Sequence, residues 1–164
     1  MGTTALGDVP GNTSGDLPVE GDKAPAFTLV ADDLSEFTLD DLPGRRVLNI
    51  FPSIGTGVCQ AGVRKFNELA GEMENTTVVN VSVDLPFAQA GFCAAEGLDN
   101  VKVGSAFRSS FGEDYGVRMV DTKFKGLLGR AVVVVDEDGT VRHSQLVPNI
   151  AQEPDYDAVL ASLG

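Results

Sequence analysis

The order of apolar segments constrains the fold of this chain more than any other feature. Two strand-like segments that are almost entirely apolar, at 45–51 and 76–84, alternate with helical patterns at 57–73 and 86–97. A strand that is apolar on both faces is typical of a parallel sheet covered by helices. Alternation at this spacing predicts parallel strands joined by right-handed crossovers, in a three-layer α/β domain.

The remaining segments extend the predicted sheet. A short strand is expected within 100–106, and "RAVVVVDEDGTVRHSQLV" at 130–147 predicts a hairpin whose turn contains Asp138 and Gly139. A final amphipathic helix is expected within 153–163. Together these elements predict a central mixed sheet flanked by helices, which is compatible with a thioredoxin-like fold.

The first part of the chain differs in composition from the rest. Residues 1–22 are rich in Gly, Asp, Thr and Pro, which predicts a loose N-terminal arm or a weak hairpin outside the main core. Residues 23–164 are then expected to form the main domain.

The charge of the chain excludes some partners. Acidic residues outnumber basic ones 24 to 12, so the formal net charge is -12, and such a field repels nucleic acid and anionic membrane surfaces. No apolar run approaches the roughly 20 residues that span a bilayer. The start of the chain has no basic and apolar regions of a signal peptide. We therefore expect a cytoplasmic protein with no nucleic-acid or membrane partner.

The chain has only two cysteines and one histidine. These are too few for a disulfide-stapled scaffold or for a structural zinc site, which usually takes four Cys or His ligands. No metal and no other cofactor is predicted. In a reducing compartment the two cysteines are either inert core residues or reactive thiols.

The first cysteine occupies a position that favours reactivity. In "PSIGTGVCQAGV", Thr56 is the natural N-cap of the predicted helix, and Cys59 is then its third residue. Unpaired N–H groups and the positive end of the helix dipole meet there, and both favour the thiolate. Pro52 stiffens the preceding turn. Cys59 is therefore predicted to be a nucleophile rather than a small buried apolar residue.

A cysteine nucleophile usually needs a basic or charged partner. His143 lies in the returning strand of the predicted hairpin, where a single His is most often a solvated surface residue, so hydrolysis by a Cys–His pair is a weak alternative. Arg130 is a better candidate, because it directly precedes the strand 131–135. In a thioredoxin-like sheet this strand runs beside the strand that leads to Cys59. A solvated charge at the strand end remains the other interpretation of Arg130.

The second cysteine, Cys93, lies inside the helical pattern "PFAQAGFCAAEGL". By itself it is more typical of packing than of chemistry. Together with Cys59 it offers a resolving partner, because a sulfenic acid on one sulfur condenses with a second thiol to form a disulfide. Phe51, Phe92, Phe124 and Leu127 are candidates for contacting the apolar part of a substrate, or are core residues.

From about Gly21 to its end the chain resembles the thiol peroxidases, a branch of the peroxiredoxins. The segments that carry the resemblance are "AFTLVADDLSEFTLDDLPGRRVLNIFPSI", "TGVCQAGVRKFNELA", "DLPFAQAGFCAAEGL" and "GRAVVVVDEDGTV". The peroxiredoxin signature Pro-x-x-x-Thr-x-x-Cys is met by Pro52, Thr56 and Cys59. A thioredoxin-type Cys-x-x-Cys motif is absent, which counts against a general disulfide reductase.

The resemblance implies specific roles. Cys59 corresponds to the peroxidatic cysteine, Cys93 to the resolving cysteine of the same chain, and Thr56 and Arg130 to the polar pair around the thiolate. It also implies a thioredoxin-like fold with an added N-terminal β-hairpin, an intramolecular disulfide, and activity on hydrogen peroxide and alkyl hydroperoxides. Thioredoxin is the implied reductant, and a homodimer the implied assembly.

Two residues depart from the family pattern, which usually has Asp at the position of Gly55 and a basic residue at that of Gly91. The first change loosens the loop before Cys59. The second places Gly inside a helix, at a cost of about 1 kcal/mol relative to Ala. Two other functions remain open: a thioredoxin-fold thiol–disulfide oxidoreductase without efficient peroxidase turnover, and a redox sensor that uses the same disulfide.

Overall fold

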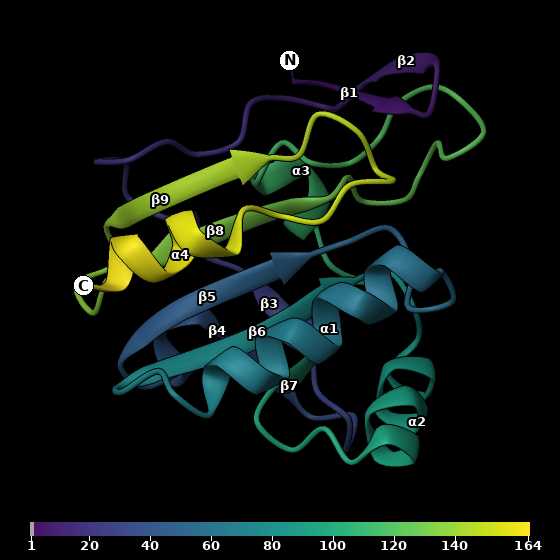
Figure 1. Ribbon diagram of the computed structural model, residues 1–164. Helices are drawn as coiled ribbons and strands as arrows, with labels where there is room; N and C mark the ends of the chain where they lie inside the picture. Colours follow the sequence, from purple (N-terminus) through teal and green to yellow (C-terminus); the bar gives the residue numbers. More distant parts are fainter. Residues whose placement is uncertain (1) are drawn as a thin grey trace.

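The computed structural model describes residues 2–164 and contains a mixed sheet with helices on both faces (Figure 1). Seven strands follow in the order β4-β3-β7-β6-β5-β8-β9. The centre is parallel, as predicted, and consists of β5 (Arg45–Ile50), β6 (Thr76–Ser82) and β7 (Lys102–Ser105). The fold class predicted from the sequence is confirmed.

Antiparallel pairs flank the parallel centre on both sides. The predicted hairpin is β8 (Ala131–Val135) and β9 (Val141–Leu146), and β8 runs antiparallel to β5. On the opposite side β3 (Thr28–Val30) pairs with β4 (Glu36–Thr38) and with β7, and a single 3-10 turn, η1 (Leu39–Asp41), follows β4.

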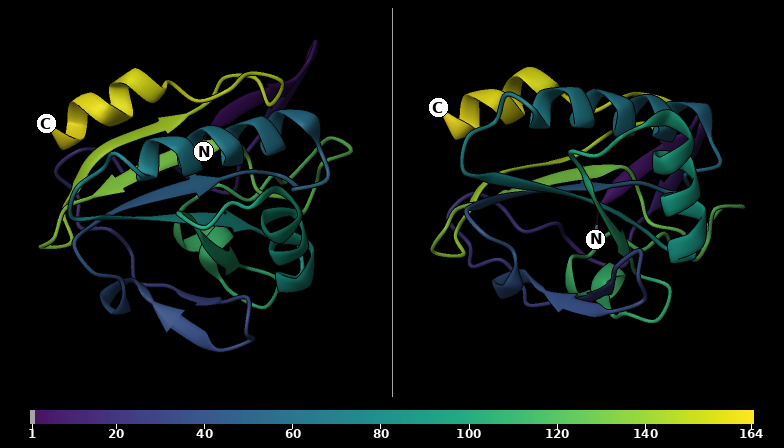
Figure 2. Two further views of the ribbon diagram at one scale, coloured as in Figure 1. Left: turned by 60° about the horizontal axis from the view of Figure 1, so that its bottom comes forward. Right: turned by 90° about the horizontal axis from the view of Figure 1, so that it is seen from below.

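The alternation of side chains along the strands explains the layers. Val47, Val132 and Val134 point to one face and pack with residues of α1 (Gly57–Ala70) and α4 (Tyr156–Leu163). Their sequence neighbours point to the other face, since successive residues of a strand alternate. There they pack with α3 (Phe111–Asp114) and its surroundings. Figure 2 shows α1 and α4 together on one side of the sheet.

The helix α2 (Pro86–Glu96) connects β6 to β7 and packs against β7. Pro86 occupies its first turn, and Gly97 ends it with a left-handed φ of 68°, as the sequence predicts for a Pro start and a Gly stop. Helix α1 ends at Ala70, with Gly71 as its C-cap, and is therefore shorter than the predicted 57–73. No helix among residues 2–164 is long and apolar enough to cross a bilayer.

The N-terminal residues form the expected hairpin, β1 (Thr3–Leu6) and β2 (Val9–Asn12), as a separate two-stranded sheet. The hairpin is not a loose arm. The backbone N–H of Ile150 donates to the carbonyl of Ala5 at 2.9 Å, and the side-chain amide of Asn149 donates to the Gly7 carbonyl and accepts from the Gly7 N–H. These bonds dock the hairpin on the segment after β9. The division of the chain at residue 22 stays a prediction.

Candidate active site

Cys59 lies at the start of α1, where the sequence predicts it. Thr56 is the N-cap with an extended backbone, and its Oγ1 accepts the backbone N–H of Cys59 at 3.3 Å. Cys59 is therefore in the first turn, where the helix dipole favours a negative sulfur. The side chain is only 1% exposed. Pro52, also buried, belongs to the loop that leads from β5 to this cap.

Arg130 is brought to Cys59 by the pairing of two strands. Because β8 is antiparallel to β5, with Ala131 opposite Ile50, the residue before β8 meets the loop after β5. The guanidinium Nη2 lies 3.2 Å from Sγ of Cys59. Nε and Nη2 also donate to the carbonyl of Ile150, at 3.0 and 2.8 Å. Arg130 is 3% exposed, so it is a buried, fixed cation beside the sulfur and not a solvated strand end.

His143 has no part in this arrangement. It lies in β9 opposite Val134, and none of the hydrogen bonds of Cys59 within residues 2–164 involves it. His143 is half-buried, and its Nε2 has no hydrogen-bond partner among the described residues, so the imidazole is only partly solvated. The geometry therefore does not support a Cys–His hydrolase.

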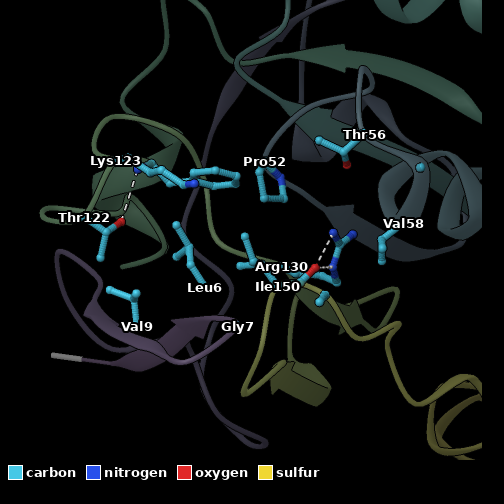
Figure 3. Close-up of a pocket in the computed structure, with 13 residues that line it drawn as sticks. Leu6, Gly7, Val9, Pro52, Thr56, Val58, Thr122, Lys123, Arg130 and Ile150 are labelled. Atoms are coloured by element: carbon cyan, nitrogen blue, oxygen red, sulfur yellow. Dashed lines mark hydrogen bonds between the residues drawn. The ribbon is translucent and has the colours of Figure 1, made fainter.

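A pocket of about 550 Å³ opens in front of Arg130 (Figure 3). Figure 3 shows Leu6 and Val9 of the hairpin on one side and Val58 and Arg130 on the other. The lining residues include no Asp or Glu; they are Leu6, Gly7, Val9, Pro52, Thr56, Gly57, Val58, Thr122, Lys123, Phe124, Arg130, Ile150 and Ala151. Cys59 is not among them, and it connects to the pocket through Arg130 and Thr56, which both line the pocket and contact Cys59.

Only one member of the proposed apolar set lines this pocket, namely Phe124. Phe51 is fully buried in the core beside Cys59. Phe92 packs under the guanidinium of Arg64, at 5.3 Å from the ring centroid. The sequence pattern did not distinguish these positions, because an apolar residue serves a core and a pocket wall equally well.

Cys93 lies in the last part of α2 and shares an apolar cluster with Cys59, Phe51, Ile54 and Val63. Both cysteines are free thiols. Burial raises the pKa of the Cys93 thiol, and the carboxylates of Asp32, Asp99 and Glu96 raise it further. Cys93 therefore remains a protonated thiol at neutral pH.

The structure adds residues that sequence reasoning missed. Ile150 supplies the carbonyl that fixes Arg130, and Asn149 fixes the hairpin that forms one pocket wall. No local sequence signal marks either residue, since both act through partners that are distant in the chain. No group of three or more His, Cys, Asp or Glu within residues 2–164 is arranged to hold a metal ion.

Comparison with known proteins places the chain in a family. The model of the Redoxin family matches residues 19–160. A thiol peroxidase of Corynebacterium glutamicum is 57% identical over 152 residues, which is 92% of each chain, and a thiol peroxidase of Mycobacterium tuberculosis is 55% identical over 154 residues, or 93% of each chain.

Solved structures agree with this assignment. A peroxiredoxin-like protein from Aquifex aeolicus superposes with a TM-score of 0.91 and 39% identity, over 98% of this chain and 95% of the other. A thiol peroxidase from Chromobacterium violaceum shares the fold with a TM-score of 0.87 at 24% identity, over 98% and 95% of the two chains. The chain therefore belongs to the redoxin family, within which it is a thiol peroxidase.

Proposed function

We propose that Cys59 is the peroxidatic cysteine and Cys93 the resolving cysteine of an intramolecular cycle that reduces hydroperoxides. The observation that carries this proposal is the contact of 3.2 Å between Arg130 Nη2 and Cys59 Sγ at the N-terminus of α1. A buried cation and a helix N-terminus both favour the thiolate, which is the reactive form of the thiol.

In the first step the Cys59 thiolate attacks one oxygen of the peroxide. The S–O bond forms as the O–O bond breaks, and the second oxygen leaves with the electron pair and takes a proton to become water or an alcohol. Arg130 and the N–H groups at the start of α1 stabilise the negative charge that develops on the oxygens. In the structure, without substrate, the Thr56 hydroxyl donates to the Ser53 carbonyl at 3.3 Å. When a peroxide binds, this hydroxyl turns toward it.

In the second step the Cys93 thiol attacks the sulfenic acid on Cys59, water leaves, and a disulfide forms. Both cysteines are buried in intact helices, whereas a disulfide fixes its two sulfurs at about 2 Å. We expect one or both helices to unwind locally so that the two sulfurs can reach this distance. Thiol exchange with thioredoxin then restores the two thiols.

The walls of the pocket support a preference among peroxides. Leu6, Val9, Val58 and Phe124 surround the approach to Arg130 with apolar side chains. Such walls favour the binding of alkyl hydroperoxides, whose apolar part they can contact. Hydrogen peroxide has no apolar part and gains no binding energy from them. The homodimer and the cytoplasmic location stay predictions from the sequence.

The proposal is tested by mixing reduced protein with cumene hydroperoxide or hydrogen peroxide and measuring the intact mass of the product. We expect fast, stoichiometric consumption that ends in an internal disulfide. Cys59→Ser should abolish it, and Cys93→Ser should stop at the sulfenic acid. Reaction no faster than that of a free thiol contradicts the proposal. Fast oxidation without turnover by thioredoxin favours the redox-sensor alternative.

A further inference from the structure

The carboxylate of Asp84 connects the loop before Cys59 to the start of the helix that carries Cys93. Asp84 lies between β6 and α2, two residues before Pro86. Its Oδ1 accepts Ser53 Oγ at 3.0 Å, and its Oδ2 accepts the backbone N–H of Ile54 at 2.7 Å. Both donors belong to the loop between β5 and α1, so a single side chain joins the two segments.

The loop residues that Asp84 holds support the cap of α1. The Ser53 carbonyl accepts the backbone N–H of Thr56 at 3.2 Å and its hydroxyl at 3.3 Å. Thr56 Oγ1 in turn accepts the N–H of Cys59. A continuous path of hydrogen bonds thus leads from Asp84 through Ser53 and Thr56 to the backbone of Cys59.

The same carboxylate is connected to α2 by buried polar groups. Ser82 Oγ donates to Asp84 Oδ2 at 2.6 Å and accepts from Gln89 Nε2 at 3.0 Å. Gln89 is 1% exposed and lies one turn before Cys93 in α2. Its Oε1 has no hydrogen-bond partner among residues 2–164. Because unpaired buried polar groups are costly, this network is sensitive to any change at Asp84.

We propose that Asp84 is a positioning residue for both halves of the reaction, an inference that rests on the proposed function. Asp84 holds the loop so that Thr56 caps α1 and Cys59 stays beside Arg130. These bonds stabilise the folded arrangement that reacts with peroxide, and they must loosen when Cys59 and Cys93 approach each other. Asp84 therefore speeds the reaction with peroxide and slows closure of the disulfide.

A side-chain pair that joins α1 to α2 without involving the loop provides a matched control. Arg64 of α1 donates to both carboxylate oxygens of Glu96 at the end of α2, at 2.5 and 2.8 Å. Among the described residues, neither side chain has a hydrogen bond to the loop 51–56. Loss of this pair loosens α2 but leaves the loop that caps Cys59 unchanged.

Stopped-flow measurements on the reduced full chain separate a phase that depends on peroxide concentration from the later closure of the disulfide. In Asp84→Ala we expect the peroxide-dependent first phase to slow by about tenfold, which is the effect of losing a hydrogen-bonded carboxylate. We expect the second phase, closure of the disulfide, to accelerate. Asp84→Asn keeps an acceptor for the Ile54 N–H, so it should recover most of the first phase. Glu96→Gln should accelerate only the second phase.

Hydrogen exchange provides a readout that needs no peroxide. In Asp84→Ala we expect faster exchange in residues 53–60 and 84–93, with the rest of the chain as in the wild type, and Asp84→Asn should restore slow exchange. Glu96→Gln should raise exchange in α2 alone. If the wild type consumes no peroxide, the proposed function is wrong, and hydrogen exchange still tests the role of Asp84 in holding the loop.

Three outcomes overturn the proposal: wild-type rates in both phases for Asp84→Ala, equal slowing of both phases, or faster exchange over the whole chain. If Asp84→Ala does not fold, Ser53→Ala replaces it, because this change removes the hydrogen bond to Asp84 Oδ1 and leaves the bond from Ile54. For Ser53→Ala we then expect the same changes in the two phases and in the exchange pattern as for Asp84→Ala, but smaller ones.

Discussion

The Nη2 atom of Arg130 donates to Sγ of Cys59 at 3.2 Å and to the carbonyl of Ile150 at 2.8 Å. The backbone N–H of Ile150 in turn donates to Ala5 in the N-terminal hairpin. A chain of contacts thus joins the hairpin, the segment after β9, the arginine and the sulfur. Each member restricts the next, so the guanidinium is already in place when a peroxide arrives.

We expect Arg130→Gln to reduce the rate constant for peroxide by about 10²- to 10³-fold, the usual effect of removing a fixed donor to a developing oxyanion. Initial rates with hydrogen peroxide measure this. Arg142→Gln is the matched control, because Arg142 lies in β9 and pairs with Asp136 at 3.3 Å. Similar rates for the two variants would show that Arg130 does not act on the peroxide.

A substitution at Val9 tests whether the N-terminal hairpin contacts the substrate as a wall of the pocket. Val9 is 55% exposed and lines the pocket, whereas Val19 is 59% exposed and is not among the lining residues. Val9→Ser should raise KM for cumene hydroperoxide roughly three- to tenfold, because apolar contact with the substrate is lost, and should leave the rate with hydrogen peroxide unchanged. Val19→Ser should change neither, and an equal effect of the two substitutions would contradict a wall at Val9.

Substitutions at Gly91 in α2 and at Gly97, which caps its end, test whether this helix unwinds before the disulfide closes. A Cβ at Gly91 meets nothing within 4 Å, so Gly91→Ala should stabilise the helix and slow closure about two- to fivefold. Gly97 has a φ of 68°, which is strained for Ala, and Gly97→Ala should accelerate closure. The peroxide-independent phase in stopped flow measures both. Equal closure rates in the two variants would place the unwinding elsewhere.

The pair between Arg64 and Glu96 predicts a dependence on pH. Hydrogen bonds from Arg64 hold the pKa of Glu96 below its usual value of 4.5. A carboxyl with a lowered pKa contributes stability above its unfolded pKa and loses it as the pH falls through the folded value. Glu96→Gln should therefore lower Tm slightly at pH 7, since the pair is exposed, and the difference should shrink below pH 4.5. A constant difference at all pH values would exclude Glu96 as its source.

The fold was predictable from the sequence because its signals are local. Alternating apolar strands and amphipathic helices define the layers, and Thr56 marks the start of α1 and therefore the place of Cys59. The Pro86 start and Gly97 stop of α2 follow the same logic. These features depend on side chains within one or two turns, which any short window of sequence contains.

Arg130 was predicted beside Cys59, but only the tertiary structure decided how the groups around the sulfur are placed. Arg130 reaches Cys59 because β8 pairs with β5 in a register that sets Ala131 opposite Ile50, and a shift of this register would move the guanidinium away from Sγ. Asn149 meets Gly7 across 142 positions of the chain, and Asp84 meets Ile54 across 30. Such contacts depend on strand register and on loop packing, which many distant residues determine together. The sequence by itself thus predicted Cys59 at the start of its helix, and folding of the whole chain decided how Arg130, the pocket wall and Asp84 are placed around it.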